Sequence, residues 1–449
     1  MIFTATIIIV VAAIILIARR VDARLVLIVA GVLLAGLAGT PARILDVFQN
    51  AVGRGDIIGP ICTAMGYAFV LRHTGCDTQM VRLLIRPVRD LSWALVPAGV
   101  AIGFVTNMAI TSQTAAAAAV GPILVPLMLA AGFTAPAAGA TLLIGCSVGG
   151  NLFNPGEPDI VAVKGATGVS IADVIASATV PTLLAAAVAI CVLLLVLSRR
   201  GILPARRASG QHPADTPLTL HDAVRAVLAP LPVILLLLLQ PRWNLVPALQ
   251  QIWPNGIAVS AIMLVCTALV MVFTAGRTMR VTGDGESGGL GRHVSQITVE
   301  FFKGMGHAFT TVISVIIAAT CFLAGLESVG AIRAFTGLIS SNPDVAHVMS
   351  PMITGVLAVI SGSGTAPSVA FSQGVLPALA AGGQLSLAVM LGISGAIGAS
   401  LGRTTSPVSA VMHFTGSISG ATIPELLRLV WLPMVAALLS TILYGLVSS

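Results

Sequence analysis

Charged side chains are scarce in this chain of 449 residues. Lys, Arg, Asp and Glu make up 9% of it, hydrophobic residues make up 57%, and the mean hydropathy is +1.02. Soluble globular domains carry roughly 25% charged residues. So few charges cannot cover the water-facing surface of a soluble fold of this length. Soluble enzymes, disordered chains and secreted disulfide scaffolds are therefore excluded, and a multi-pass membrane protein is expected.

Motifs for cofactors, metals and catalysis are also missing. The six cysteines form no CxxC pair, and five lie in apolar stretches, where small buried hydrophobes are expected. No P-loop, GxGxxG or HExxH site stands out. Gly398 to Gly402 matches GxSxG, but no His or acid is near, so close helix packing is the better interpretation. Dense basic runs are absent too. We expect neither an enzyme, nor a nucleic-acid partner, nor a cofactor beyond a coupling Na⁺ or H⁺.

Several apolar stretches have the length of simple membrane spans. A bilayer core of ~30 Å needs about 20 helical residues, and fewer where polar edges contribute. The predicted simple spans are 4–18, 25–40, 57–71, 174–197, 224–240, 257–274, 308–326 and 429–447.

Two long stretches, 91–156 and 345–402, contain no Asp, Glu, Lys or Arg and are rich in Gly, Pro, Ser, Thr and Asn. Such residues at membrane depth indicate broken backbone, which must line a protein-walled cavity because lipid cannot satisfy it. We predict re-entrant hairpins at about 91–131 and 348–381, turning at 111–114 and 361–367. Each precedes a broken helix, at about 136–165 and 384–414, which unwinds at 149–158 and 400–407.

The basic residues test this topology. With the N-terminus outside and each hairpin returning to its side of entry, 17 of the 23 Lys and Arg residues fall on the cytoplasmic side and 5 outside. This bias follows the positive-inside rule. It predicts a bacterial inner-membrane protein with both termini periplasmic. The basic residue left over is Arg403, between uncharged runs.

The two halves of the chain repeat at a nearly constant spacing. Matching features lie 251 residues apart, or one more for the last pair: Ser112 and Ser363, Thr114 and Thr365, Pro126 and Pro377, Asn154 and Ser406. Residues 1–200 and 223–449 each form a predicted repeat of five transmembrane helices, one of them broken, plus one hairpin; a cytoplasmic linker spans 201–222. Five spans is an odd number, so the second repeat is inverted. All-α folds of this kind, with scaffold and transport domains, are typical of secondary transporters.

The stretches Ser361-Gly-Ser-Gly-Thr-Ala-Pro367 and Leu401-Gly-Arg-Thr-Thr-Ser-Pro-Val-Ser409 resemble the C4-dicarboxylate uptake C (DcuC) family of the ion-transporter superfamily. The segment order and the sequence Ala-Gly-Leu-Glu-Ser-Val-Gly before the second hairpin extend the resemblance over nearly the whole chain. The resemblance implies a homodimer, carriage of succinate- or fumarate-like dianions, and an elevator mechanism.

A dianion at mid-membrane needs hydrogen-bond donors and positive potential, which the N-termini of half-helices supply. Unwound carbonyls can hold Na⁺ instead, so Na⁺ at the hairpin tips is a second expectation. Taken singly, such Ser, Thr and Gly residues also serve helix packing. The predicted substrate-binding residues are Thr111, Ser112, Gln113, Thr114, Asn151, Asn154, Ser363, Gly364, Thr365, Arg403, Thr404, Thr405 and Ser406.

Three charged residues are the sharpest candidates. Arg403 predicts a bidentate carboxylate contact, since a guanidinium at membrane depth is costly. The alternative is an ion pair with Glu157 or Asp159. Those two carboxylates are candidate coupling-ion ligands, with Arg403 partners or a solvated loop as alternatives.

The predicted function is secondary transport of C4-dicarboxylates such as succinate, fumarate or malate across the bilayer, cation-coupled or by exchange. The alternatives are transport of another small organic anion, such as a hydroxy acid or amino-acid derivative, and an anion channel.

Overall fold

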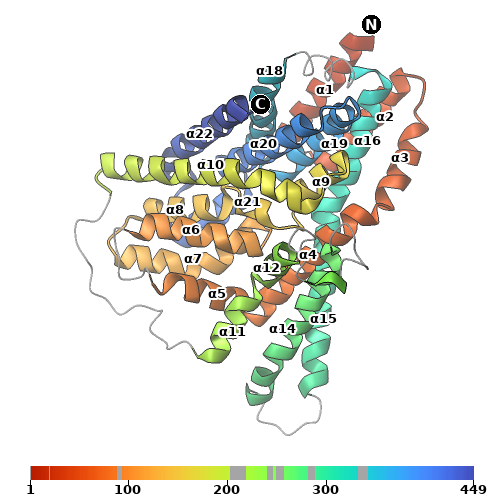
Figure 1. Cartoon of the computed structure of the whole chain (residues 1–449). Coiled ribbons are helices and arrows are strands. Elements are labelled where there is room, and N and C mark those ends of the chain that lie inside the picture. The colour runs from red at the N-terminus through yellow and green to blue at the C-terminus, as the bar shows by residue number, and fades with distance from the viewer. Residues whose placement is uncertain are drawn as a thin grey trace.

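The protein is helical throughout the part of the chain that its computed structural model describes, which is residues 2–19, 21–87, 94–202, 219–239, 246–248, 257–281, 289–331 and 342–448 (Figure 1). Within those ranges no residue is in a β-strand. The prediction of an all-α protein is confirmed.

Seven helices in the described residues are long and apolar enough to cross a membrane. They are Gln113–Ala130, Ala135–Thr167, Ile171–Arg199, Gly291–Ser328, Asp344–Ser361, Leu385–Thr404 and Ile423–Ser448. Large apolar side chains such as Leu443, Val272 and Ile8 are exposed on the surface, as lipid contact requires. The prediction of a multi-pass membrane protein is confirmed.

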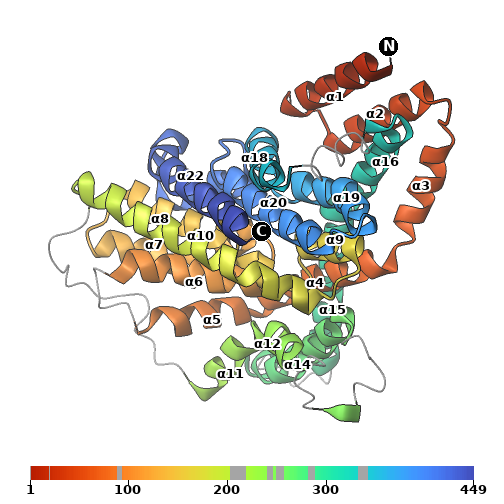
Figure 2. The same ribbon diagram turned by 45° about the horizontal axis from the view of Figure 1, so that its top comes forward.

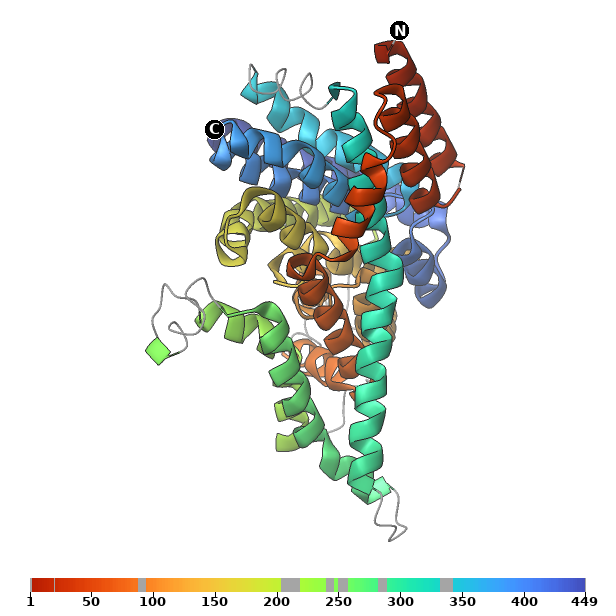
Figure 3. The same ribbon diagram turned by 90° about the vertical axis from the view of Figure 1, so that its right-hand side faces the viewer.

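One set of helices stands steeply in Figure 1 and reaches from top to bottom of the molecule in Figure 3. α4 packs against α14 and α15, and α16 packs against α2 and α3. Small residues bring the backbones close: a Cβ on Gly31 would lie 2.6 Å from the Cys321 carbonyl oxygen. We call this set the upright group: α1 (Ile2–Ala18), α2 (Ala23–Leu37), α3 (Arg43–Val52), α4 (Gly55–Thr74), α14 (Val259–Val281), α15 (Gly289–Ala308) and α16 (Ser314–Ser328).

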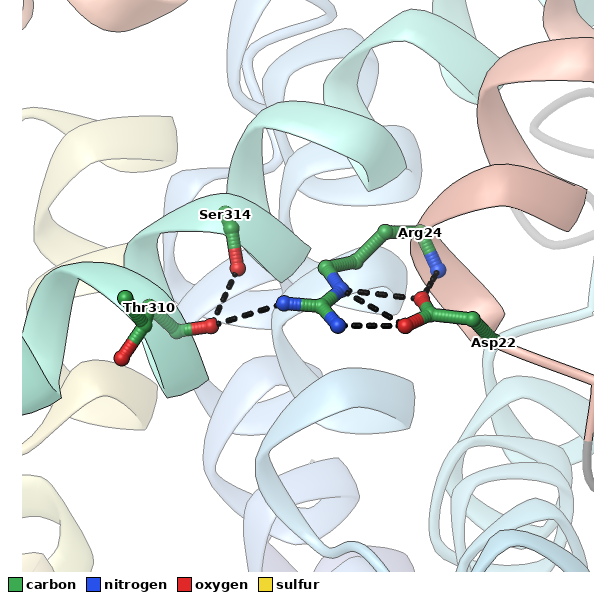
Figure 4. A network of polar contacts seen from close by, with 4 residues as sticks. All are labelled: Asp22, Arg24, Thr310 and Ser314. Carbon is green, nitrogen blue, oxygen red and sulfur yellow. Dashed lines mark hydrogen bonds and ion pairs between the residues drawn. The ribbon is translucent and has the colours of Figure 1, made fainter.

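α15 and α16 are one long helix interrupted by a π-helical turn, Phe309–Ile313. The Thr310 carbonyl oxygen accepts hydrogen bonds from Arg24 Nη1 at 3.0 Å and from Ser314 Oγ at 2.7 Å (Figure 4). Asp22, between α1 and α2, holds the Arg24 guanidinium through an ion pair. The hydrogen bonds from Arg24 lower the pKa of the Asp22 carboxyl to about 2. The start of α2 is thus tied to the π-turn.

Most of the remaining helices lie across the upright group, with α8, α10, α20 and α22 side by side in Figure 2. α10 packs against α22, α6 against α8, and α18 against α20. We call this set the crossing group: α6 (Leu95–Ala109), α7 (Gln113–Ala130), α8 (Ala135–Ser147), the 3₁₀ turn η2 (Gly150–Phe153), α9 (Pro158–Thr167), α10 (Ile171–Arg199), α18 (Pro343–Ser361), α19 (Thr365–Ala381), α20 (Leu385–Thr404), α21 (Ala410–Ser419) and α22 (Ile423–Ser448).

Element boundaries in the crossing group recur at the spacing seen in the sequence. The first residues of α7 and α19 are as far apart in the sequence as Asn154 and Ser406. The first residues of α10 and α22 are separated by the same number of residues. The glycines that follow α9 and α21, Gly168 and Gly420, repeat this spacing, and both are left-handed, with φ of 74° and 76°. Glycine serves at such helix ends because it has no Cβ to clash.

Three predictions from the sequence differ from the structure. The span expected at 224–240 is two short helices, α11 (Leu220–Leu228) and α12 (Leu231–Leu238), because Pro230 and Pro232 interrupt the helix. The Gly-rich sequence of residues 276–299 also predicts a soluble loop, but α14 continues to Val281 and α15 begins at Gly289. Unwinding expected from residue 400 begins only after Thr404. Residues 203–218 of the predicted linker and 91–93 of the first hairpin lie outside the described residues.

Candidate functional site

Two short turns join the helix pairs α6–α7 and α18–α19. The first turn is residues 110–112, and Ser112 caps α7 by accepting a hydrogen bond from the Ala115 amide at 3.3 Å. Gln113 and Thr114 therefore lie in the first turn of α7 and not in the loop. The second turn is residues 362–364, entered through left-handed Gly362. Thr365 begins α19. Both turns leave the N-terminal amides of a helix facing them.

The break between α8 and α9 is bonded to the end of α6. The Asn151 amide donates to Asn107 Oδ1 at 3.1 Å, and Asn107 Nδ2 donates to the Ile110 carbonyl at 3.0 Å. Asn154 Nδ2 donates to the Met108 carbonyl at 2.8 Å. These bonds satisfy carbonyls at the end of α6, so Asn107, Asn151 and Asn154 hold the first turn in place.

The break between α20 and α21 is anchored in the corresponding way. Ser406 Oγ donates to the Val359 carbonyl at 2.7 Å, near the end of α18. Asn154 and Ser406 occupy matching positions in the two halves of the chain. The residues that accept their hydrogen bonds, Met108 and Val359, are separated by nearly the same number of residues. Thr405 instead bonds locally, donating to the Gly402 carbonyl at 2.9 Å.

The ends of α8 and α20 meet at a hydrogen bond between the hydroxyls of Ser147 and Thr404. Both residues are fully buried. Thr404 is among the site residues predicted from the sequence, whereas Ser147, two residues before the predicted break at 149–158, is not. This contact brings the two broken segments together.

Arg403 lies in the last turn of α20, where the sequence predicted an unwound loop. Its side chain is 6% exposed. A Cβ built on Gly364 would lie 2.7 Å from Arg403 Nη1, so the guanidinium sits directly beneath the second turn. Within the described residues, Nε and Nη2 have no hydrogen-bond partner. A buried guanidinium with unpaired donors is costly and is suited to receive an anion.

Glu157 and Asp159 are buried, at 2% and 1% exposure, so the interpretation as a solvated loop is wrong. Asn151 Nδ2 donates to Glu157 Oε1 at 2.7 Å. Glu157 Oε2 and Asp159 Oδ1 have no partner in the described residues. The Arg403 charge acts on both carboxylates. Nevertheless, no ion pair within 4.0 Å joins Arg403 to either one in that part of the chain.

When all three are ionised, Arg403, Glu157 and Asp159 together carry a net charge of one negative unit. Burying an unbalanced charge costs many kcal/mol unless a counter-ion or a proton neutralises it. Glu157 and Asp159, which we call the acid pair, can therefore accept one proton or one cation. Either would neutralise the excess charge and occupy the unpaired carboxylate oxygens.

A small cavity separates the second turn from the upright group. Its volume is about 20 Å³, enough for one water molecule. Its lining residues are Thr311, Val312, Val315, Ile316 and Ala319 from the π-turn and α16, and Ser363, Thr365, Ala366 and Val369 from the second turn and α19. Ser363 and Thr365 thus border this cavity.

Not all predicted site residues come together. The structure clusters Asn151, Glu157 and Asp159 in the first half, and Gly364 with Arg403 in the second. Among the described residues, no hydrogen bond joins Thr111, Ser112, Gln113 or Thr114 to Arg403 or to the second turn. In the same part of the chain, no group of three or more His, Cys, Asp or Glu could hold a metal ion.

Comparison with known proteins places these features in context. The sequence model of the family "DcuC: C4-dicarboxylate anaerobic carrier" matches residues 48–448. The chain is 24% identical to the anaerobic C4-dicarboxylate transporter DcuC of Escherichia coli K12 over 395 residues, covering 86% of this chain and 80% of that one. It is 38% identical to an uncharacterized transporter of Haemophilus influenzae over 121 residues, covering 27% of this chain and 83% of the other.

A solved structure also resembles this one. The YdaH transporter of Alcanivorax borkumensis aligns with a TM-score of 0.58 and 17% identity, covering 90% of this chain and 86% of that one. At this identity the match speaks for the fold alone. The sequence relatives are transporters, which confirms the prediction that the chain is not an enzyme.

Proposed function

Because the chain belongs to the C4-dicarboxylate anaerobic carrier (DcuC) family, we propose that this membrane transporter carries small C4-dicarboxylates such as succinate, fumarate or malate across the bacterial inner membrane. The observation that carries the proposal is the Arg403 guanidinium, buried beneath the second turn with two nitrogens unpaired. One substrate carboxylate binds these nitrogens. The amides at the start of α19, with Ser363 and Thr365, stabilise its charge.

The coupling ion binds at the acid pair. Glu157 and Asp159 are buried, and one oxygen of each has no hydrogen-bond partner in the described residues. A bound proton or cation would supply the missing partner and neutralise one of the two charges. The experiment is uptake of labelled succinate into proteoliposomes with imposed proton or Na⁺ gradients. We expect Glu157→Gln and Asp159→Asn each to remove the gradient dependence. Unchanged dependence in both variants would exclude a coupling role.

The two repeats are inverted and move as an elevator in a homodimer. The recurrence of helix boundaries at a constant spacing supports the repeat, and an asymmetry in packing supports the motion. α4 of the upright group packs against α9, whereas its counterpart α16 packs against α19. In symmetric repeats the exchanged contacts, α4 with α7 and α16 with α21, belong to the opposite state of the cycle.

Cross-linking tests this motion. Thr320 Oγ1 of α16 donates to Gln373 Oε1 of α19 at 2.6 Å, so the pair spans the two groups. With the native cysteines replaced, a short cross-link between Thr320→Cys and Gln373→Cys should abolish succinate counterflow that the same variant shows before cross-linking. The control is Arg43→Cys with Glu327→Cys, an ion pair at 2.5 Å within the upright group, whose cross-link should leave uptake intact. Full uptake through the first cross-link would exclude the elevator.

A channel is the rival class. Saturable counterflow of succinate in proteoliposomes is expected of a transporter, and linear, non-saturating flux would refute the proposal.

A further inference from the structure

A line of unpaired polar groups runs along α19. Ser368 and Ser372 lie one turn apart, are 1% and 0% exposed, and their hydroxyls have no partner in the described residues. Gln373 Nε2, next along the helix, is also unpaired there. A buried hydroxyl without a hydrogen bond costs about 1–3 kcal/mol. Three such groups in a row need an explanation beyond packing.

The fold of a helix pair does not require these groups. At the 251-residue spacing, Ser368 and Ser372 correspond to Ala117 and Gly121 of α7. Gln373 corresponds to Pro122. α7 forms the same kind of helix with no polar side chain at these positions. The polar line is therefore a property of the second half only.

The line connects two different places. At one end, the Ser368 hydroxyl interacts with the Asp159 carboxylate, although the two groups do not reach the geometry of a full hydrogen bond. At the other end, Gln373 Oε1 accepts the hydrogen bond from Thr320 of α16, and both residues are half-buried. One turn from Gln373, Val369 lines the cavity that has room for one water molecule. The line thus runs from the half-buried pair of Thr320 and Gln373, one helical turn from the cavity, to the buried pair of Glu157 and Asp159.

We propose that Ser372 and Ser368 form a proton relay to Asp159, so that the ion coupled to dianion transport is H⁺, and that Thr320 and Gln373 hold the water molecule from which the proton enters. Each serine hydroxyl accepts a proton on one side and releases its own on the other, with single waters bridging the ~5 Å between successive turns. The proton enters from water as hydronium and ends on a carboxylate of the acid pair, and no other reactant is needed. The inference rests on the proposed transport function.

The charges around Asp159 are compatible with this role. Arg403 of α20 and Glu157 are the charged groups that act on it. α4, also packed on α9, contributes Arg54, whose guanidinium lies beside Gly165 at the far end of α9. α10 contributes Asp173, which is exposed in its first turn. α19 has no charged residue.

The test measures succinate-driven proton entry into proteoliposomes with an internal pH dye, alongside succinate counterflow at equal pH. We expect Ser368→Ala with Ser372→Ala to slow proton entry at least tenfold while counterflow stays within twofold of wild type. Ser368→Thr with Ser372→Thr, which keeps both hydroxyls, should retain proton entry. The control is Thr415→Ala, which removes a buried, unpaired hydroxyl from α21.

Three outcomes would overturn the relay. They are wild-type proton entry in the double alanine variant, equal losses of proton entry and counterflow, and succinate uptake by the wild type that follows Na⁺ without proton movement. The last would leave the transport function standing. Absence of succinate counterflow in the wild-type protein would instead refute the proposed function, and the relay with it.

Discussion

Replacing Arg403 by lysine tests the proposed substrate site while keeping its positive charge. The guanidinium offers two unpaired nitrogens beneath Gly364, and a lysine ammonium cannot present the same planar pair. Losing one hydrogen bond to a charged carboxylate costs roughly 1.5–3 kcal/mol. With a factor of ten for every ~1.4 kcal/mol, succinate binding should weaken roughly 10- to 150-fold.

The assay is equilibrium binding of labelled succinate to purified protein, with thermal unfolding as the check on folding. Arg72→Lys is the matched control, since Arg72 is exposed in the last turn of α4. It should bind succinate normally. A dissociation constant for Arg403→Lys within twofold of wild type would falsify the assignment.

A second pair of variants separates substrate contact from charge balance. Arg403→Gln leaves both buried carboxylates uncompensated and should lower thermal stability. Adding Glu157→Gln restores the original net charge of the cluster. We expect this double variant to regain stability but not succinate binding. Recovery of binding together with stability would show that Arg403 serves only to balance charge.

Further variants probe the scaffold of the site. A Cβ on Gly402 would collide with the Gly355 carbonyl oxygen, so Gly402→Ala should lower the free energy of unfolding in detergent by about 1–3 kcal/mol. Gly36→Ala is the control, because a Cβ on Gly36 of α2 meets nothing within 4 Å. This variant should be neutral or stabilising. Asn154→Ala and Ser406→Ala should each cost about 1 kcal/mol, measured in the same way, because each removes one matching anchor bond. The pKa of Asp22 is lowered from 3.8 to about 2, so its contribution is complete above pH 4 and is lost as pH falls through 2. The melting-temperature difference of Asp22→Asn should therefore stay constant from pH 5 to 8; a change within that range would contradict the assignment.

Hydropathy and residue spacing were enough to establish the class and layout of this protein. Lipid excludes unsatisfied backbone, so the scarcity of charge required membrane helices, and the uncharged stretches marked where those helices are interrupted. Gly149 and Pro158 delimit the first break as expected, because glycine and proline act on the local backbone. The DcuC family resemblance was likewise visible in the sequence and is confirmed.

Tertiary packing decided which side chains meet. A buried serine on α19 has the same local sequence character as one facing lipid, so the contact of Ser368 with Asp159 appears only when α9 packs against α19. The small and polar neighbours of Arg403 predict a loop, but packing of α20 against α18 extends the helix past Arg403. Burial of Glu157 and its bond from Asn151 also depend on this assembly. The low charge content of the sequence indicates a membrane protein, because lipid excludes charge. Which groups neutralise the few buried charges depends on contacts between helices that are distant in the sequence.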